Sequence, residues 1–202
     1  VSIAAGGAVF AVSGDGYGSE GSLTRDDGTA VTGSPHPLDE IARAAALCND
    51  AVLHRRDGAW TVDGDPMEGA LLALSHTLQP DGAKAFARWT RTGVIPFDAR
   101  HRYMASLHHD HEGHAAIYVE GAPERIIAMC STQRGASGRS QRLDRDVWHA
   151  AANDIAAKGQ RVLAFAVRNV PAAHKLLAVS DVDGHLTLLG LVGLMDPPRP
   201  EA

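Results

Sequence analysis

The sequence predicts an α+β domain built on a twisted antiparallel β-sheet flanked by helices. Apolar residues make up 45% and charged residues 21% of the 202 residues, a composition typical of a globular protein. Several segments in which apolar and polar residues alternate follow one another across short Gly-containing turns, as in β-hairpins. Segments with helical spacing lie between some of them, and no internal boundary is evident. We therefore expect one domain over residues 1–202.

The first half of the chain alternates short strands with helices. Leu38, Ile41, Ala45 and Cys48 recur at the spacing of one helix face. In order, the expected elements are a strand beginning at Val1, a strand at 8–13, a helix at about 38–50, a hairpin turning at Asp57-Gly58, a helix after Asp65 that stops at Pro80, and a shorter helix around Phe86 and Trp89.

The second half is richer in strands. Leu143, Val147, Ala151 and Ile155 indicate a helix, with Gly159 placed to end it. The expected elements are strands at about 102–108 and 114–120, a helix from Pro123, a mobile Ser/Gly/Arg-rich loop at 131–142, the helix ended by Gly159, and strands at 161–168, 176–182 and 185–193, the last two joined by Asp183-Gly184.

Composition excludes several functional classes. The net charge of −5 provides no basic field for nucleic acid, so any phosphate must meet a local cluster of arginines. The two cysteines, Cys48 and Cys130, form no disulfide framework and favour a reducing compartment. No apolar run reaches the roughly 18 residues that a membrane span needs.

The most informative segment is Gly64 to Leu71. Asp65 suits the N-cap of a helix, Pro66 the first helical position, and Glu68 the third position of a capping box. On physical grounds this is a well-formed helix start with a carboxylate directed back at the turn.

Three later segments indicate what function this helix start could have. They are Pro96-Phe97-Asp98-Ala99-Arg100-His101-Arg102, Glu120-Gly121-Ala122-Pro123-Glu124 and Gly159-Gln160-Arg161-Val162-Leu163-Ala164. In this order, and together with Leu47-Cys48-Asn49-Asp50-Ala51 and Asp196-Pro197-Pro198-Arg199-Pro200, they resemble the nucleotide-binding (N) domain of P-type cation-transporting ATPases, calcium-pump-like branch. The resemblance implies that the chain corresponds to a domain lying between the phosphorylation-motif segment and a hinge at about 196–200.

The resemblance implies roles for seven residues. Phe97 would stack on adenine, and Glu68 would lie at the edge of the base. Arg161 would reach a phosphate, a task that suits the planar guanidinium. The nucleotide-binding residues implied are Glu68, Phe97, Arg102, Glu120, Gly121, Ala122 and Arg161. Taken alone, Phe97 also fits a buried core position, and Arg161 a surface position at a strand start.

The family has the sequence K-G-A-P-E where this chain has residues 120–124, so Glu120 stands in place of the family's lysine. A negative charge there opposes a polyanionic ligand, with Arg102 and Arg161 as possible compensating cations. We expect that Glu120→Lys would tighten ATP binding if the side chain faces the pocket. A pocket spoiled by Glu120 would leave a non-catalytic interaction module as the alternative function.

The resemblance also bounds the mechanism. The family's phosphorylated D-K-T-G-T sequence and its later Mg²⁺-binding aspartate motifs are not in the 202 residues, so we expect binding of Mg-ATP without hydrolysis and no metal held by the protein. The implied partners are adenine nucleotide and the phosphorylation and actuator domains of the same pump. Neither nucleic acid nor direct membrane contact is expected, and the implied location is the cytoplasmic side of an integral membrane protein.

Two further patterns suggest other kinds of binding site. Gly16 to Gly21 matches G-x-G-x-x-G, but the residues after it read as a loop, not as the helix that a dinucleotide fingerprint needs. His108, His109, His111 and His114, with Asp110 and Glu112, could form a metal-responsive site. Their place at a hairpin tip favours a solvated turn instead.

Overall fold

A computed structural model describes residues 1–14, 16–18, 21–31, 33 and 35–195. Its centre is a ten-stranded sheet in which β3-β2-β1-β12-β11-β8-β7-β6 lie side by side, and β10 and β9 join it at β12. The strands are β1 (Ser2–Ala5), β2 (Ala8–Val12), β3 (Leu23–Arg25), β6 (Thr90–Asp98), β7 (Tyr103–His109), β8 (His114–Gly121), β9 (Cys130–Arg134), β10 (Ser140–Arg142), β11 (Arg161–Pro171) and β12 (Leu186–Leu194). All pairs are antiparallel except β12 with β9, so the expected antiparallel α+β class is confirmed.

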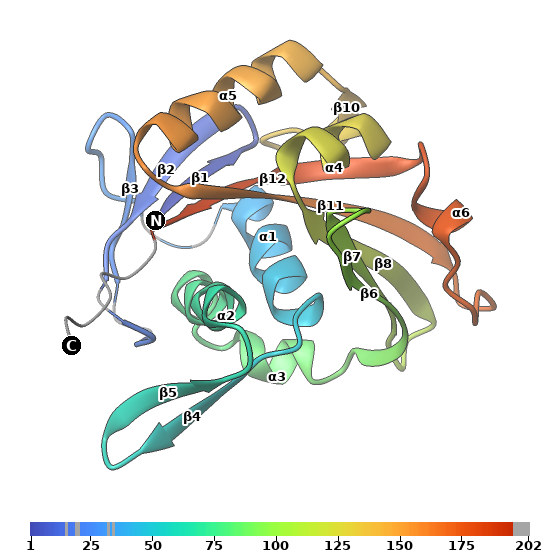
Figure 1. Ribbon diagram of the computed structural model, residues 1–202, viewed down its shortest axis with the longest axis horizontal. Helices are drawn as coiled ribbons and strands as arrows, with labels where there is room; N and C mark the ends of the chain where they lie inside the picture. Colours follow the sequence, from blue (N-terminus) through green and yellow to red (C-terminus); the bar gives the residue numbers. More distant parts are fainter. Residues whose placement is uncertain (15, 19–20, 32, 34, 196–202) are drawn as a thin grey trace.

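Helices cover both faces of this sheet, as Figure 1 shows. Helices α1 (His36–Leu47), α2 (Pro66–Leu78) and α3 (Gly82–Phe86) lie on one side; α4 (Pro123–Met129) and α5 (Arg145–Ala157) lie on the other, and α6 (Val179–Val182) is a single turn before β12. Each face has its own apolar core. Phe10, Leu38 and Leu71 belong to one core, and Ile117, Ile126 and Trp148 to the other. No helix among the described residues is both long and apolar enough to cross a membrane.

The helix starts follow the capping chemistry of the sequence, with one correction. The Asp65 carboxylate accepts hydrogen bonds from the backbone N–H groups of Met67 (2.8 Å) and Glu68 (3.3 Å), which makes it the expected N-cap of α2. The capping box was wrong, because the Glu68 carboxylate accepts the backbone N–H of Asp50 (3.0 Å) instead. Gly159 has a φ of +76° and ends α5 as predicted.

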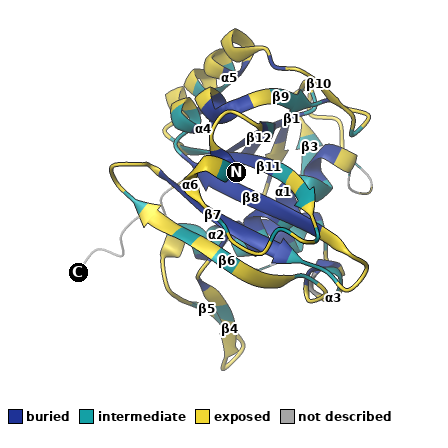
Figure 2. Ribbon diagram, turned by 90° about the vertical axis from the view of Figure 1, so that its right-hand side faces the viewer, coloured by how far each residue is buried: buried dark blue, intermediate teal, exposed yellow. Residues whose placement is uncertain are grey.

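A separate two-stranded sheet projects from the α2 side. It consists of β4 (Val52–Arg56) and β5 (Ala59–Asp63), joined at Asp57-Gly58 with φ values of 51° and 83°, as the predicted hairpin requires. Figure 2 shows this hairpin and the outer strand β6 as largely exposed, whereas β7, β8 and β11 are buried at the centre of the sheet.

Three local predictions were wrong. Residues 131–142, expected as a mobile loop, form most of the β9–β10 hairpin, since β9 gains hydrogen bonds along β12 that polar side chains alone do not reveal. Residues 176–182, expected as a strand, end in α6, where the Asp181 carboxylate accepts the backbone N–H of Ala178 (2.8 Å). Strand β6 was not predicted as an element. The predicted hinge at 196–200 lies outside the described residues.

Candidate functional site

A cavity of about 260 Å³ opens where the first turn of α2 meets the sheet. It is close to the lower end of the roughly 300–1,000 Å³ usual for small-molecule sites. Its lining residues are Asp65, Met67, Glu68, Leu71, Phe97, Met104, Glu120, Gly121, Arg161 and Leu163. The structure thus brings together five of the seven predicted residues: Glu68, Phe97, Glu120, Gly121 and Arg161.

The sheet register explains why residues so distant in sequence converge. Strand β8 lies between β7 and β11, and Glu120 is paired with Met104 on one side and with Phe165 on the other. Glu120 follows Tyr118 at the two-residue period of a strand, so both side chains point toward the α1–α2 layer. Glu68, in the first turn of α2, covers this end of the sheet.

Phe97 is not a core residue. Its side chain is 58% exposed, although it lines the cavity from β6. Large aromatic side chains are usually buried in a folded protein, so an exposed ring at a cavity wall marks a surface available for a ligand. The core reading of Phe97 is therefore wrong.

Glu68 is fixed at the mouth of the cavity by the end of α1. Its Oε2 accepts the Asp50 N–H, and its backbone carbonyl accepts the Asn49 side-chain amide (2.9 Å). Partial burial raises the pKa of Glu68, and the nearby carboxylates of Asp50 and Asp65 add to this rise. The residue provides an oriented acceptor whose position depends on the Leu47–Ala51 segment.

Glu120 faces the cavity but is buried, with 6% of its surface exposed. Burial raises the pKa of Glu120 well above its ordinary value, and the carboxylates of Glu68, Asp50 and Asp65 raise it further. The uncharged acid is thereby favoured. The charge repulsion expected for Glu120 is correspondingly weakened, and the predicted compensation by Arg102 does not occur.

Arg102 and Ala122 are not among the residues that line the cavity. The Arg102 guanidinium donates to the Glu124 carboxylate, while its backbone carbonyl accepts the Ala122 N–H (3.0 Å). Arg102 also has a φ of 59°, unusual for a residue with a side chain. These contacts give Arg102 and Ala122 a part in shaping the turn beside the cavity.

Gly121 is required by close packing. A Cβ atom there would lie 2.3 Å from the Arg102 carbonyl oxygen and 2.7 Å from the Tyr103 Cα. The glycine therefore lets β8 lie close to β7 at the end of the strand.

Arg161 is the one cation among the described lining residues. It is the first residue of β11, exposed at the cavity edge. Its five N–H donors could reach an anionic group bound at the cavity mouth. The other predicted cation, Arg102, is committed to Glu124.

Sequence reasoning missed the apolar part of the wall. Leu71, Met104 and Leu163 line the cavity beside the polar residues. Met104 could have been found from strand pairing, because a residue opposite Glu120 on β7 must share its face. The combination of an apolar wall with a few polar groups is typical of a small-molecule site.

A larger cavity of about 690 Å³ lies elsewhere, between the β3 region and the α2–α3 turn. Asp81 is the one charged residue among its described lining residues, so it offers no comparable set of convergent polar groups. The segment Gly16 to Gly21 is nearby, with residues 19 and 20 outside the described part. It leads to β3, and strand β3 takes the place of the helix that a dinucleotide fingerprint requires.

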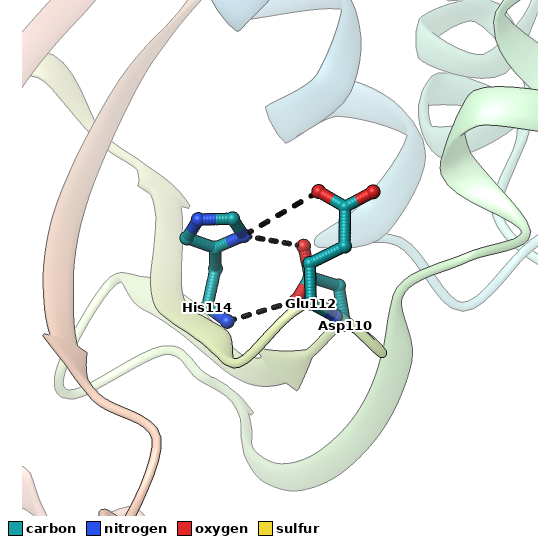
Figure 3. Close-up of side chains that lie close together, drawn as sticks. All are labelled: Asp110, Glu112 and His114. Carbon is teal, nitrogen blue, oxygen red and sulfur yellow. Dashed lines mark hydrogen bonds and ion pairs between the residues drawn. The ribbon is translucent and has the colours of Figure 1, made fainter.

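The histidine-rich turn is organised by Asp110, as Figure 3 shows. Its carboxylate accepts the backbone N–H groups of Glu112 (2.9 Å) and His114 (2.8 Å) and pairs with the His114 ring (2.7 Å). Asp110, Glu112 and His114 could each offer one ligand atom within 4.8 Å of the others. Their hydrogen bonds already account for the conformation of a solvated turn.

The comparison with known families agrees with this geometry. The family described as "P-type ATPase, cytoplasmic domain N" matches residues 37–201. The chain belongs to this family. The resemblance inferred from the sequence motifs is thereby confirmed.

Individual relatives point the same way. The cation-transporting ATPase pma1 of Synechocystis is 37% identical over 98% of this chain and 22% of its own length. Human calcium-transporting ATPase type 2C member 1 is 33% identical over 93% of the chain and 19% of its length, and the calcium-transporting ATPase of Bacillus subtilis is 29% identical over 97% and 22%. The chain spans about a fifth of the length of these relatives.

Proposed function

We propose that this N domain binds ATP, as Mg-ATP, in the cavity between α2 and β8 and presents the γ-phosphate to the phosphorylation domain of a P-type cation-transporting ATPase. The observation that carries the proposal is the 58% exposed Phe97 ring on a cavity wall that also holds Glu68 and Arg161. An aromatic face, an oriented acceptor and a cation are the three groups needed for a base and its phosphates.

The size of the cavity indicates which part of the nucleotide it can enclose. At about 260 Å³ the cavity suits the adenosine end, while the phosphates pass Arg161 toward solvent. A bound nucleotide would then expose its γ-phosphate. In the whole pump this arrangement would act by proximity, with the N domain bringing the phosphate to an aspartate on a neighbouring domain.

The proposed partners follow from the family. They are adenine nucleotide and the phosphorylation and actuator domains of the same pump, whose substrate is a cation. We propose further that the whole protein is an integral membrane enzyme that carries this domain on its cytoplasmic side.

Calorimetric titration of the chain with ATP, ADP, AMP and adenosine tests the binding proposal. All four should bind, and loss of the γ-phosphate should have little effect because the base provides most of the contacts. Val94→Ala is a matched control for substitution of Phe97, because Val94, like Phe97, is exposed on β6 but does not line the cavity. Absence of adenine-nucleotide binding at millimolar ligand would contradict the proposal and favour the alternative, an interaction module with a spoiled pocket.

A further inference from the structure

Glu120 carries a buried polar atom for which the described residues provide no partner. Its Oε2 is inaccessible to solvent and has no hydrogen bond within the described part of the chain, although the residue lines the cavity. Leaving such a group unpaired costs free energy, and the cost is higher for an ionised group. The position therefore favours a protonated side chain, whose carboxyl group must turn toward the cavity to meet a bound ligand.

The carboxylates around Glu120 reinforce this assignment. Glu68, in the first turn of α2, and Asp65, its N-cap, line the same cavity, and Asp50 lies in the connection between α1 and β4. Their negative charges disfavour the ionised form of a nearby carboxyl group. Glu120 is the most deeply buried of the four, and its pKa is raised further than that of Glu68, so the uncharged form is favoured at Glu120.

The remaining titratable neighbours do not supply a compensating charge. Cys48, at the C-terminal cap of α1, is fully buried, and burial raises the pKa of its thiol well above the ordinary range. Arg91, on β6, pairs with Asp50 (2.7 Å). Arg161, on β11, stands at the exposed edge of the cavity.

Given the nucleotide-binding function proposed above, on which this step rests, we propose that Glu120 is a specificity-determining residue that donates its carboxylic O–H to a ring nitrogen of adenine, beside a Glu68 carboxylate that accepts from the exocyclic amino group. Adenine carries this combination, an amino donor next to a ring-nitrogen acceptor, on two edges, with N1 on one and N7 on the other. Two neighbouring carboxyl groups with separated pKa values can thus recognise one base by opposite roles.

The arrangement makes base recognition depend on one proton. Ionisation of Glu120 removes the O–H donor and places a negative charge near the nucleotide. Affinity for adenosine should therefore fall as pH rises through the pKa of Glu120. By linkage, bound adenosine should raise that pKa, because the ligand binds the protonated form.

Two variants distinguish the effect of the hydrogen-bond donor from the effect of side-chain shape on adenosine binding. Glu120→Gln keeps a donor but cannot ionise, and Glu120→Met has similar length without a polar group. At about pH 6.5, Glu120→Gln should bind adenosine within about threefold of the native chain, and Glu120→Met roughly 5- to 12-fold more weakly, the value of one hydrogen bond. As pH rises through the raised pKa of Glu120, affinity should fall for the native chain and stay level for Glu120→Gln.

Modified bases identify the acceptor. Replacing a ring nitrogen by C–H, in 1-deazaadenosine or 7-deazaadenosine, should weaken binding to the native chain for one of the two analogues and should leave binding to Glu120→Met unchanged. Glu112→Gln is the matched control, because Glu112 lies on an exposed turn outside the cavity. Equal losses for both analogues in both proteins would overturn the proposed hydrogen bond.

Carbon-13 NMR of the Glu120 carboxyl group tests the proton in the native chain without any variant. The expected result is a raised pKa that rises further with adenosine present. An ordinary pKa, or one that adenosine does not move although adenosine binds, would overturn the inference while leaving the proposed function intact. If adenosine, ATP, ADP and AMP all fail to bind at any pH, the proposed function fails, and this inference fails with it.

Discussion

The Glu68 carboxylate accepts the backbone N–H of Asp50 at 3.0 Å, which ties the first turn of α2 to the residues that follow α1. The expected capping box would have turned this side chain toward its own helix start. The observed contact instead holds it at the cavity mouth, with Oε2 occupied and the second oxygen able to accept from a ligand.

Glu68→Gln should reduce the preference for ATP over GTP. The amide oxygen can still accept the Asp50 N–H, but the NH₂ group would then meet the adenine amino group donor to donor, whereas it could donate to the guanine oxygen. We expect the ratio of ATP to GTP affinity to fall roughly 10-fold or more, as for a hydrogen bond to a charged group. Competition calorimetry measures the ratio. Asp63→Asn, on the exposed β5, removes the same charge outside the cavity and should leave the ratio unchanged.

Phe97→Ala should weaken ATP binding by roughly 5- to 150-fold, because stacking of a base on an aromatic ring contributes about 1–3 kcal/mol. Phe97→Trp should largely retain binding. Since the ring is 58% exposed, the substitution should leave the fold intact, and circular dichroism checks this. A folded Phe97→Ala variant with native affinity would show that the base does not stack there.

Arg161→Gln should weaken ATP binding more than adenosine binding, because the guanidinium lies at the cavity edge and would contact phosphate alone. The difference between the two ligands should be about 5- to 10-fold at low salt and should shrink as salt rises. Arg102→Gln should have a smaller effect, since Arg102 already pairs with Glu124 outside the cavity. Calorimetry at two salt concentrations measures both variants. The reverse order of effects would place the phosphates beside Arg102.

The 202-residue chain should bind ATP without forming a phosphoenzyme. It contains no D-K-T-G-T sequence, whose aspartate receives the phosphate in the pumps that the chain resembles. Incubation with γ-labelled ATP followed by acid precipitation measures any covalent label, with heat-denatured chain as the blank. Acid-stable label above that blank would mean that a residue within this chain accepts phosphate.

The sequence predicted much of the site by two routes. The capping chemistry of Asp65 depends on a few neighbouring residues, so it predicted the start of α2 directly. The family resemblance of the ordered motifs implied the cavity residues Glu68, Phe97 and Arg161, which lie far apart in the sequence.

Features that depend on tertiary context were not predictable in the same way. The burial of Glu120 depends on the helix layer that covers β8, and the Arg102–Glu124 pair depends on the pairing of β7 with β8, which brings the start of β7 beside the start of α4. The β9–β10 hairpin likewise forms because β12 offers β9 an edge to pair with. These contacts join segments whose separate sequences give no sign of one another.

His108 should make stability depend on pH in the acidic range. The side chain is 2% exposed, its Nε2 lies 3.0 Å from the Ser106 hydroxyl, and its Nδ1 has no hydrogen-bond partner among the described residues. Burial, with a contribution from Arg91, lowers the pKa of His108 to about 4. The folded state therefore binds fewer protons than the unfolded state between about pH 4 and pH 6.5, and the free energy of unfolding must rise with pH across that window.

The contribution of His108 should be lost as pH falls from about 6.5 to about 4, and its size should be on the order of 3 kcal/mol. Glu120 acts in the opposite sense, because its raised pKa lowers stability as pH rises above the ordinary range of a glutamate. The difference between native chain and His108→Gln isolates the histidine from this opposing effect. Urea denaturation at several pH values should show a shallower acid dependence for His108→Gln, with the exposed His185→Gln as control. Parallel pH profiles for the native chain and His108→Gln would mean that His108 is protonated as readily in the folded state as in the unfolded state.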